Sequence, residues 1–208
     1  MKVLKFGGSS VKNADSIAKV INIVANQAKK DKVFVVVSAF GSTTNNLIKT
    51  AKLAEAKDKK YKKLFVEIEN HHIDVVKALI AANIQSGVIG NVKRLTSQLE
   101  ILFDGCFMLE ELTDKALATI SGFGERLSSY IISEAAKHSL DADFKDSSEL
   151  IVTNSNFLNA EVDFEKTNKK CKKFFKKNKN QVIILPGFIS RSEKGELTTL
   201  GRGGSDYT

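Results

Sequence analysis

The chain has 208 residues, of which 42% are hydrophobic and 27% are charged, and its formal net charge is +8. This composition is ordinary for a soluble globular protein, and the length indicates one domain with a sizeable core. No run approaches the roughly 18 apolar residues of a membrane span, and the apolar N-terminal run is too short for a signal peptide. We therefore expect a cytoplasmic protein.

The positive charge is concentrated in two lysine-rich stretches, residues 57–63 and 166–179. A basic balance is compatible with nucleic acid, a membrane surface or an anionic ligand. The lysines have helical spacing and no glycine-arginine or aromatic-arginine pattern, which favours solvated helix faces over a nucleic-acid surface. Cys106 and Cys171 lie far apart without metal-type spacing, so we expect reduced thiols.

The first elements form a strand–helix–strand unit. Residues 3–6 are a short apolar run that ends in Gly7-Gly8, which predicts a buried strand and a glycine turn. Apolar residues recur at helical spacing over 17–28, which predicts an amphipathic helix. Residues 33–37 (VFVVV) are continuously apolar, as in a strand covered on both faces.

The middle of the chain is predominantly helical in character. Residues 45–115 are rich in Ala, Leu, Lys and Glu, and Ser86-Gly87 and Gly90-Asn91 punctuate them. Residues 121–124 (SGFG) predict a glycine loop, and residues 125–137 predict a helix that starts after it.

The last third adds further strands. Residues 143–146 and 150–153 predict a short strand region, 164–177 a helix, and 182–185 (VIIL) a buried strand ended by Pro186-Gly187. Residues 197–200 resemble a hairpin arm. The fold class that follows is α/β, a three-layer αβα sandwich with a mostly parallel central sheet.

Ligands bind at the carboxyl ends of the strands in such sheets. Four distinctive loops are expected there: 7–8, 38–44, 186–187 and 201–206.

The first of these loops lies in KFGGSS, where Lys5 precedes two glycines and two hydroxyls. Glycines let backbone N–H groups approach an anion, and a lysine adds charge. The lysine precedes the glycines, unlike a P-loop, and the glycines are adjacent, unlike a dinucleotide fingerprint. A phosphate-binding turn and a tight βα turn both remain open.

Two further loops each have two interpretations. VSAFGSTTNN, which starts one residue before Ser38, offers hydroxyls and amides that could bind a polar ligand or cap the next helix. Glu125, expected in the first turn of its helix, could interact with the helix dipole or with a substrate cation.

The final stretch, TTLGRGGSDYT, is the most unusual. Arg202 between glycines can clamp a carboxylate or phosphate in bidentate fashion. Ser205 and Asp206 can cap a helix, and Asp206 can also orient a lysine or a metal. The three histidines have no triad or metal spacing, so core or surface roles are favoured, and Cys106 is expected to be a packed thiol.

KFGGSSV, VSAFGSTTN, GFGERLSS, PGF and TTLGRGGSDYT, in this order, resemble the aspartate kinases over essentially the whole chain. The resemblance implies the amino-acid kinase fold and transfer of the γ-phosphoryl group of ATP, with Mg²⁺, to the β-carboxylate of L-aspartate. The product is 4-phospho-L-aspartate, at the entry to lysine, methionine and threonine synthesis. Some members are fused to homoserine dehydrogenase, and most carry ACT domains downstream.

Site roles follow from the same resemblance. Lys5 would neutralise charge on the transferred phosphoryl group, and Asp206 would orient Lys5. Gly7, Gly8 and Ser9 would hold phosphate, although family members usually have Thr in place of Ser9.

The aspartate pocket is also carried over from the matching motifs. Arg202 would pair with the α-carboxylate of aspartate, and Glu125 would receive its α-ammonium. Ser38, Thr44 and Ser205 would complete the pocket.

The resemblance assigns residues 1–208 to the N-terminal, aspartate-binding portion of the catalytic domain. In the family, the segments that hold the nucleotide and the ACT domains follow this motif. We therefore expect this chain alone to be nearly inactive and the full-length enzyme to be a homodimer or higher homo-oligomer.

Two alternatives stay open. Another kinase of the same fold could act on glutamate, N-acetylglutamate or UMP. Glu125 and Arg202 distinguish these substrates, because only a zwitterionic amino acid needs a partner for both an ammonium group and a carboxylate. N-acetylglutamate has no ammonium group, and UMP is a nucleotide. A basic nucleic-acid-binding module, supported by the +8 charge, is the other alternative.

Overall fold

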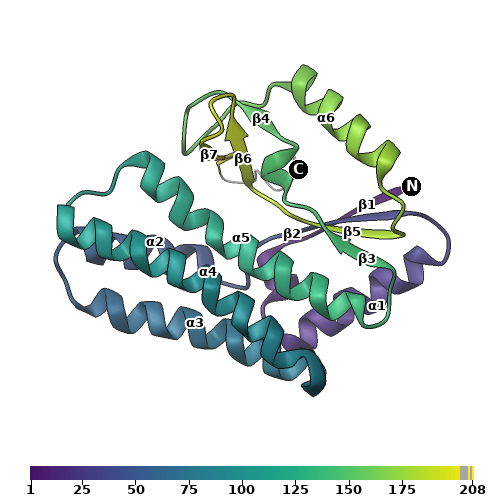
Figure 1. The fold of residues 1–208 in the computed structure, drawn as a ribbon, viewed down its shortest axis with the longest axis horizontal. Coiled ribbons are helices and arrows are strands. Elements are labelled where there is room, and N and C mark those ends of the chain that lie inside the picture. The colour runs from purple at the N-terminus through teal and green to yellow at the C-terminus, as the bar shows by residue number, and fades with distance from the viewer. Residues whose placement is uncertain (202–205, 207) are drawn as a thin grey trace.

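Four parallel strands form the centre of the molecule (Figure 1). In this computed structural model, which describes residues 1–201, 206 and 208, their order is β1-β2-β5-β3. The strands are β1 (Lys2–Phe6), β2 (Val33–Val37), β5 (Val182–Pro186) and β3 (Ala142–Phe144). The predicted parallel central sheet is confirmed.

The two faces of the sheet are covered by different helices. Alternate residues of a strand point to opposite faces. Val33, Val35 and Val37 of β2 therefore join the larger core beneath α1 and α5, whereas Phe34 points the other way. There the Phe34 ring lies 4.5 Å from the ring of Phe175 on α6. Burial on both faces explains why β2 has no polar residue.

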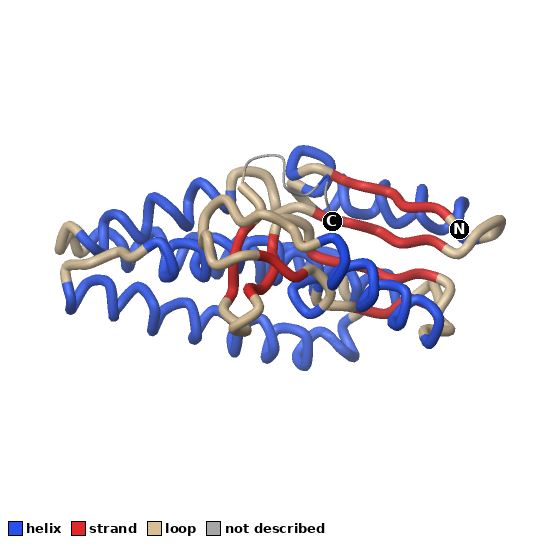
Figure 2. The backbone as a smooth tube through the Cα atoms, turned by 90° about the horizontal axis from the view of Figure 1, so that it is seen from above, coloured by secondary structure: helices blue, strands red, loops and turns tan. Residues whose placement is uncertain are grey.

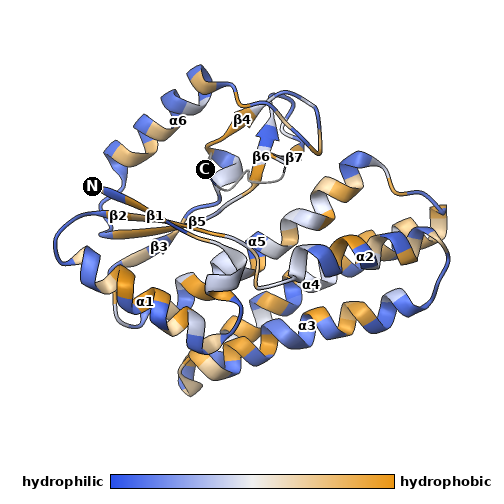
Figure 3. Cartoon of the chain, turned by 180° about the vertical axis from the view of Figure 1, so that it is seen from behind, coloured by the Kyte–Doolittle hydropathy of each residue, from blue (hydrophilic) through white to orange (hydrophobic). Residues whose placement is uncertain are grey.

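Helix α6 (Phe164–Lys177) is the outer layer on that second face. Figure 3 shows it as mostly hydrophilic with interspersed hydrophobic residues. Of the hydrophobic residues, Cys171, Phe174 and Phe175 pack onto the sheet, whereas Phe164 at the start of the helix is exposed. Its lysines are exposed, in keeping with solvated helix faces.

The other helices are α1 (Ala14–Ala28), α2 (Thr43–Glu55), α3 (Lys60–Leu79), α4 (Ala82–Leu109) and α5 (Asp114–Lys137). Helices α2 to α5 pack on one another and project beyond the sheet on one side (Figure 2). None of the described helices has an apolar stretch long enough to cross a membrane.

A small second sheet stands beside the first. It contains β4 (Val152–Thr153), β6 (Ile189–Ser192) and β7 (Leu197–Thr199), in the order β4-β6-β7. Strands β6 and β7 are antiparallel, so the predicted hairpin arm is confirmed. Two single-turn 3₁₀ helices, η1 (Gly8–Val11) and η2 (Ser147–Glu149), complete the described elements.

The glycine loop predicted at residues 121–124 is wrong, because these residues lie inside α5. The helix begins earlier, where the Thr113 hydroxyl oxygen accepts a hydrogen bond from the N–H of Ala116. The glycines serve close packing instead. A Cβ atom on Gly122 would lie 3.0 Å from Ile189 Cγ2, and one on Gly124 would lie 2.8 Å from Ala39 Cβ.

The interruptions predicted at residues 86–87 and 90–91 are also wrong. Both pairs lie within α4, which runs unbroken for 28 residues. The buried side of α4 carries an apolar series at helical spacing that holds the helix in place despite its glycines. The members of that series are Val88, Val92, Leu95, Leu99 and Phe103.

We expect Gly124→Ala to lower the free energy of unfolding by about 1 kcal/mol. Overpacking against the rigid Ala39 Cβ costs about 1–3 kcal/mol and exceeds the roughly 1 kcal/mol that alanine adds in helix propensity. Gly87→Ala is the matched control. It meets open space in α4, and should raise the free energy of unfolding by about 0.5–1 kcal/mol. Urea unfolding would measure both, and equal effects would contradict the packing role of Gly124.

Candidate functional site

Three loops meet at the carboxyl edge of the central sheet. Because β1, β2 and β5 are parallel and in register, the residues that follow them lie side by side. The Ser38 N–H donates to the Phe6 carbonyl at 3.1 Å, and the Gly187 N–H donates to the Val37 carbonyl at 2.8 Å. The sequence analysis predicted the binding loops at this edge.

The loop after β1 touches the loop after β2 through backbone atoms. The Gly41 N–H donates to the Gly8 carbonyl at 3.1 Å. A Cβ on Gly8 would lie 3.0 Å from the carbonyl oxygens of both Ala39 and Gly41. Gly41 itself has φ +51°, a left-handed conformation that glycine adopts without strain. Gly7 has open space around it, and Ser9 is exposed at the start of η1. This turn therefore leaves its backbone accessible to a ligand.

Residues 38–44 continue into α2. Ser42 is the residue before the helix, yet its side chain makes no capping hydrogen bond. The Thr43 hydroxyl donates back to the Phe40 carbonyl at 2.6 Å. The Thr44 hydroxyl faces α5, 3.4 Å from where a Cβ on Gly124 would stand. The interpretation that these hydroxyls only cap a helix is thus wrong for Ser42.

Glu125 lies in the middle of α5, not in a first turn, so a role as a helix-dipole partner is excluded. The residue is 5% exposed. Burial raises the pKa of its carboxyl to about 8, against a smaller lowering from a hydrogen bond with the Ala39 backbone. Its Oε2 atom has no hydrogen-bond partner among the described residues. A buried oxygen without a partner can accept a hydrogen bond from a ligand that carries a hydrogen-bond donor.

Two serines of α5 hold this region together. The Ser128 hydroxyl donates to the Ser38 carbonyl at 2.8 Å, and the Ser129 hydroxyl donates to the Glu125 carbonyl at 2.6 Å. Sequence analysis did not single them out. Their spacing of three and four residues after Glu125 was the available signal.

Lys5 lies at the end of β1 and pairs with Asp206. Lys5 Nζ is 2.8 Å from Asp206 Oδ1, with the side chains 40% and 65% exposed. An ion pair this exposed contributes at most about 1 kcal/mol to stability. The end of the described chain therefore returns to the first strand. The other predicted residues of that stretch, Arg202 and Ser205, lie outside the described residues.

The histidines take core and surface positions, as expected. His72 is fully buried, with Nδ1 donating to the Ile68 carbonyl at 2.7 Å and its ring stacked on Phe40 at 5.3 Å. Burial lowers the pKa of His72 to about 4. His71 and His138 are exposed. Within the described part of the chain, no group of three or more His, Cys, Asp or Glu residues could hold a metal ion.

The raised pKa of Glu125 predicts a pH-dependent stability. Between its usual value of 4.5 and about pH 8, the folded chain holds a proton that the unfolded chain releases. The free energy of unfolding therefore falls as pH rises through this window. We expect Glu125→Gln to remove this fall, so that the variant gains stability over wild type from pH 5 to pH 8 in urea unfolding. Glu134→Gln, at a half-buried position of α5 where the carboxylate pairs with Lys137, is the control. Parallel pH profiles for Glu125→Gln and wild type would contradict a buried, protonated carboxyl.

The amino acid kinase family matches residues 1–208. Among curated relatives, the bifunctional aspartokinase/homoserine dehydrogenase of Buchnera aphidicola is 27% identical, over 100% of this chain and 26% of its own length. Aspartokinase 1 of Arabidopsis thaliana chloroplasts is 32% identical, over 99% of this chain and 36% of its own. The crystal structure of Escherichia coli aspartokinase III with aspartate and ADP matches with a TM-score of 0.87 and 27% identity, over 99% of this chain and 44% of that one. The chain thus spans less than half the length of these proteins. It belongs to the amino acid kinase family.

Proposed function

We propose that the protein containing these residues is an aspartate kinase, which phosphorylates the β-carboxylate of L-aspartate with ATP to give 4-phospho-L-aspartate. The single observation that carries the proposal is the Glu125 carboxyl group, which is buried beside the 38–44 loop and has one oxygen without a hydrogen-bond partner among the described residues. The similarity to aspartokinase III in complex with aspartate and ADP supports it. Residues 1–208 would form the aspartate-binding portion of the catalytic domain.

In this proposal Glu125 receives the α-ammonium group of aspartate. Removal of a carboxylate from water is costly, and an ammonium group in direct contact offsets that cost. Arg202 pairs with the α-carboxylate, and Ser38, Thr44 and Ser205 complete the pocket. The Ser128 hydrogen bond to the Ser38 carbonyl fixes the loop against the helix that carries Glu125.

The phosphoryl-transfer side consists of Lys5, Asp206 and the glycine turn. Lys5 neutralises charge on the transferred phosphoryl group, and its ion pair with Asp206 fixes where the ammonium stands. Gly7, Gly8 and Ser9 offer backbone N–H groups and a hydroxyl to phosphate oxygens. The attacking carboxylate of aspartate is already ionised near neutral pH, so no base is required.

Magnesium fits this site only together with the nucleotide. The described residues contain no cluster that would hold a metal alone, and Mg²⁺ is commonly held by substrate phosphates plus one or two carboxylates. Asp206, which contacts Lys5, is the carboxylate that would take part. When bound, MgATP supplies the phosphoryl group and a metal ion that neutralises developing charge.

Ligand-observed NMR with millimolar L-aspartate and L-glutamate tests the substrate half. We expect aspartate to contact the chain and glutamate, one methylene longer, to give no signal. Glu125→Gln and Arg202→Ala should each abolish the aspartate contact, whereas Glu134→Gln should preserve it. Contact with glutamate alone would favour a kinase of the same fold with another acceptor. Aspartate contact unchanged in Glu125→Gln would overturn the proposed role of Glu125.

Phosphoryl transfer by the full-length protein tests the other half. We expect Lys5→Met to lower kcat by about 10²–10³-fold, the usual cost of removing one group that stabilises transition-state charge. Lys2→Met, at the other end of β1, changes the same net charge away from the site and should leave kcat near wild type. Equal kcat values for both variants would exclude Lys5 from the reaction.

A further inference from the structure

A surface cavity of about 400 Å³ lies between the start of α6 and the hairpin formed by β6 and β7. It shares no residue with the proposed substrate and phosphoryl-transfer sites. Four cationic residues and one acidic residue line it, so its formal net charge is +3. They are Lys166, Lys169, Lys170, Arg191 and Glu193. Such an excess of positive charge in a concave site favours an anionic ligand.

Strand β4 holds the two walls of the cavity together. Val152 of β4 is paired with Arg191 of β6. On its other side, the Val152 N–H donates to the Thr167 hydroxyl oxygen at 3.0 Å, and the Asp163 N–H donates to the Val152 carbonyl at 2.8 Å. Figure 1 shows β4 between β6 and α6 accordingly. Val152 therefore lies at the base of the cavity, with Arg191 on one side and the first turns of α6 on the other.

The guanidinium group of Arg191 is held in one orientation. Its Nε donates to the Ser148 hydroxyl oxygen at 3.2 Å, and its Nη1 donates to the Gly195 carbonyl at 3.1 Å. Its third nitrogen, Nη2, has no partner among the residues that the structure describes, and the residue is exposed. A guanidinium that is already oriented loses less freedom when it binds an anion.

The lysines of α6 form the opposite wall. Residues 166, 169 and 170 share one face of the helix because they are three and four positions apart. Lys166 Nζ is 2.5 Å from Glu193 Oε1 and 3.2 Å from Asp163 Oδ2. Within the described part of the chain, Lys169 and Lys170 make no hydrogen bond or ion pair. These two ammonium groups and Arg191 supply the charge that remains for a ligand.

A phosphate monoester has the charge and the shape that this cavity suits. At neutral pH it carries a charge of about −1.5 to −2 and three terminal oxygens that accept hydrogen bonds. A carboxylate carries only one charge, whereas an arginine together with lysines matches phosphate. The cavity is also larger than a phosphate ion, and Val152 and the lysine stems add apolar surface for an organic group.

We propose that this cavity binds a small phosphate monoester. The phosphate group lies between Arg191 on one side and Lys169 and Lys170 on the other. The organic part of the ligand lies against Val152. This site is separate from the glycine turn that is proposed to hold the phosphates of ATP.

The test uses butyl phosphate, with inorganic phosphate and pentanoate as matched probes. Inorganic phosphate lacks the butyl chain, and pentanoate replaces the phosphate group with a carboxylate. In ligand-observed NMR on the chain, we expect butyl phosphate to bind more tightly than either probe. Lys170→Gln should weaken butyl phosphate by about fivefold, the upper end for one exposed charge pair. Lys177→Gln, two turns further along α6, makes the same change of charge outside the cavity and should leave the affinity unchanged.

Two further variants separate a ligand site from a structural effect. Glu193→Gln removes the negative charge from the cavity and should strengthen butyl phosphate by about threefold. A variant that merely disturbed the structure would not bind more tightly. Lys5→Met changes the proposed ATP site and should leave butyl phosphate unchanged. Lys170 and Glu193 are exposed, so both variants are expected to fold, and urea unfolding verifies this.

Each contrary result overturns the proposal in a defined way. Loss of binding in Lys5→Met with no effect of Lys170→Gln would place the ligand at the glycine turn. Equal losses in Lys170→Gln and Lys177→Gln would mean diffuse attraction to a basic helix. Inorganic phosphate or pentanoate binding as tightly as butyl phosphate would exclude a site for phosphate monoesters. No contact by butyl phosphate at millimolar concentration would exclude the site altogether.

Discussion

The close approach of helix α5 to the loop after β2 is the constraint on which the candidate site depends. Gly124 permits this approach, since any side chain there would collide with Ala39. Gly8 permits a second close approach, by the turn after β1, because a Cβ there would lie 3.0 Å from the carbonyl oxygens of Ala39 and Gly41. The loop is thus held between two backbones. The geometry of the site therefore depends on glycine at these two positions as much as on the side chains of the other residues.

This packing produces two different electrostatic environments at one edge of the sheet. Glu125 is shielded from water because α5 lies so close to Ala39, and its carboxyl favours the neutral form. Lys5 and Asp206 form an ion pair in contact with solvent. In the proposed reaction the first environment suits recognition of a fixed positive charge. The second suits charge that changes during the reaction.

Sequence reasoning succeeded where one local pattern had one physical meaning. Residues 33–37 and 164–177 were predicted to the residue. A continuous apolar run admits few structures other than a buried strand. The structure adds the cap of the helix, Asp163, whose side chain accepts a hydrogen bond from the N–H of Lys166. Sequence reasoning failed at the glycines of α4 and α5. In α4 the apolar series on the buried side keeps the helix intact, although Gly87 and Gly90 have open space around them. In α5, Gly122 and Gly124 are close-packing positions, and the neighbours that approach them are far away in sequence.

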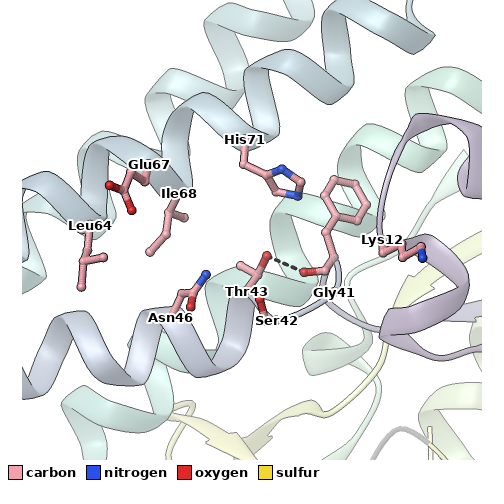
Figure 4. Close-up of a pocket in the computed structure, with 10 residues that line it drawn as sticks. Lys12, Gly41, Ser42, Thr43, Asn46, Leu64, Glu67, Ile68 and His71 are labelled. Atoms are coloured by element: carbon pink, nitrogen blue, oxygen red, sulfur yellow. Dashed lines mark hydrogen bonds between the residues drawn. The ribbon is translucent and has the colours of Figure 1, made fainter.

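The candidate site was predicted in the same uneven way. Lys5, Gly8, Glu125 and Asp206 were all named from their motifs, and the structure brings Lys5 to Asp206 and Gly8 to the 38–44 loop. The burial of Glu125 was not predictable, since it follows from helix continuity through residues 121–124. A cavity of about 320 Å³ beside Phe40 (Figure 4) was also not predictable from the sequence, because the residues that line it, such as Lys12 and Glu67, come from separate elements.

The protonated state of Glu125 has a consequence for ligand binding itself. A carboxyl with a pKa of about 8 holds its proton in most molecules at neutral pH. An ammonium group docking beside it favours the ionised form, so the proton leaves to the solvent as the ligand enters. Association would then exchange the proton on Glu125 for the ammonium group of the ligand. Because the buffer takes up the released proton, the measured binding enthalpy would include the ionisation heat of the buffer. Acidification would weaken binding by stabilising the unliganded, protonated chain, without any change in fold.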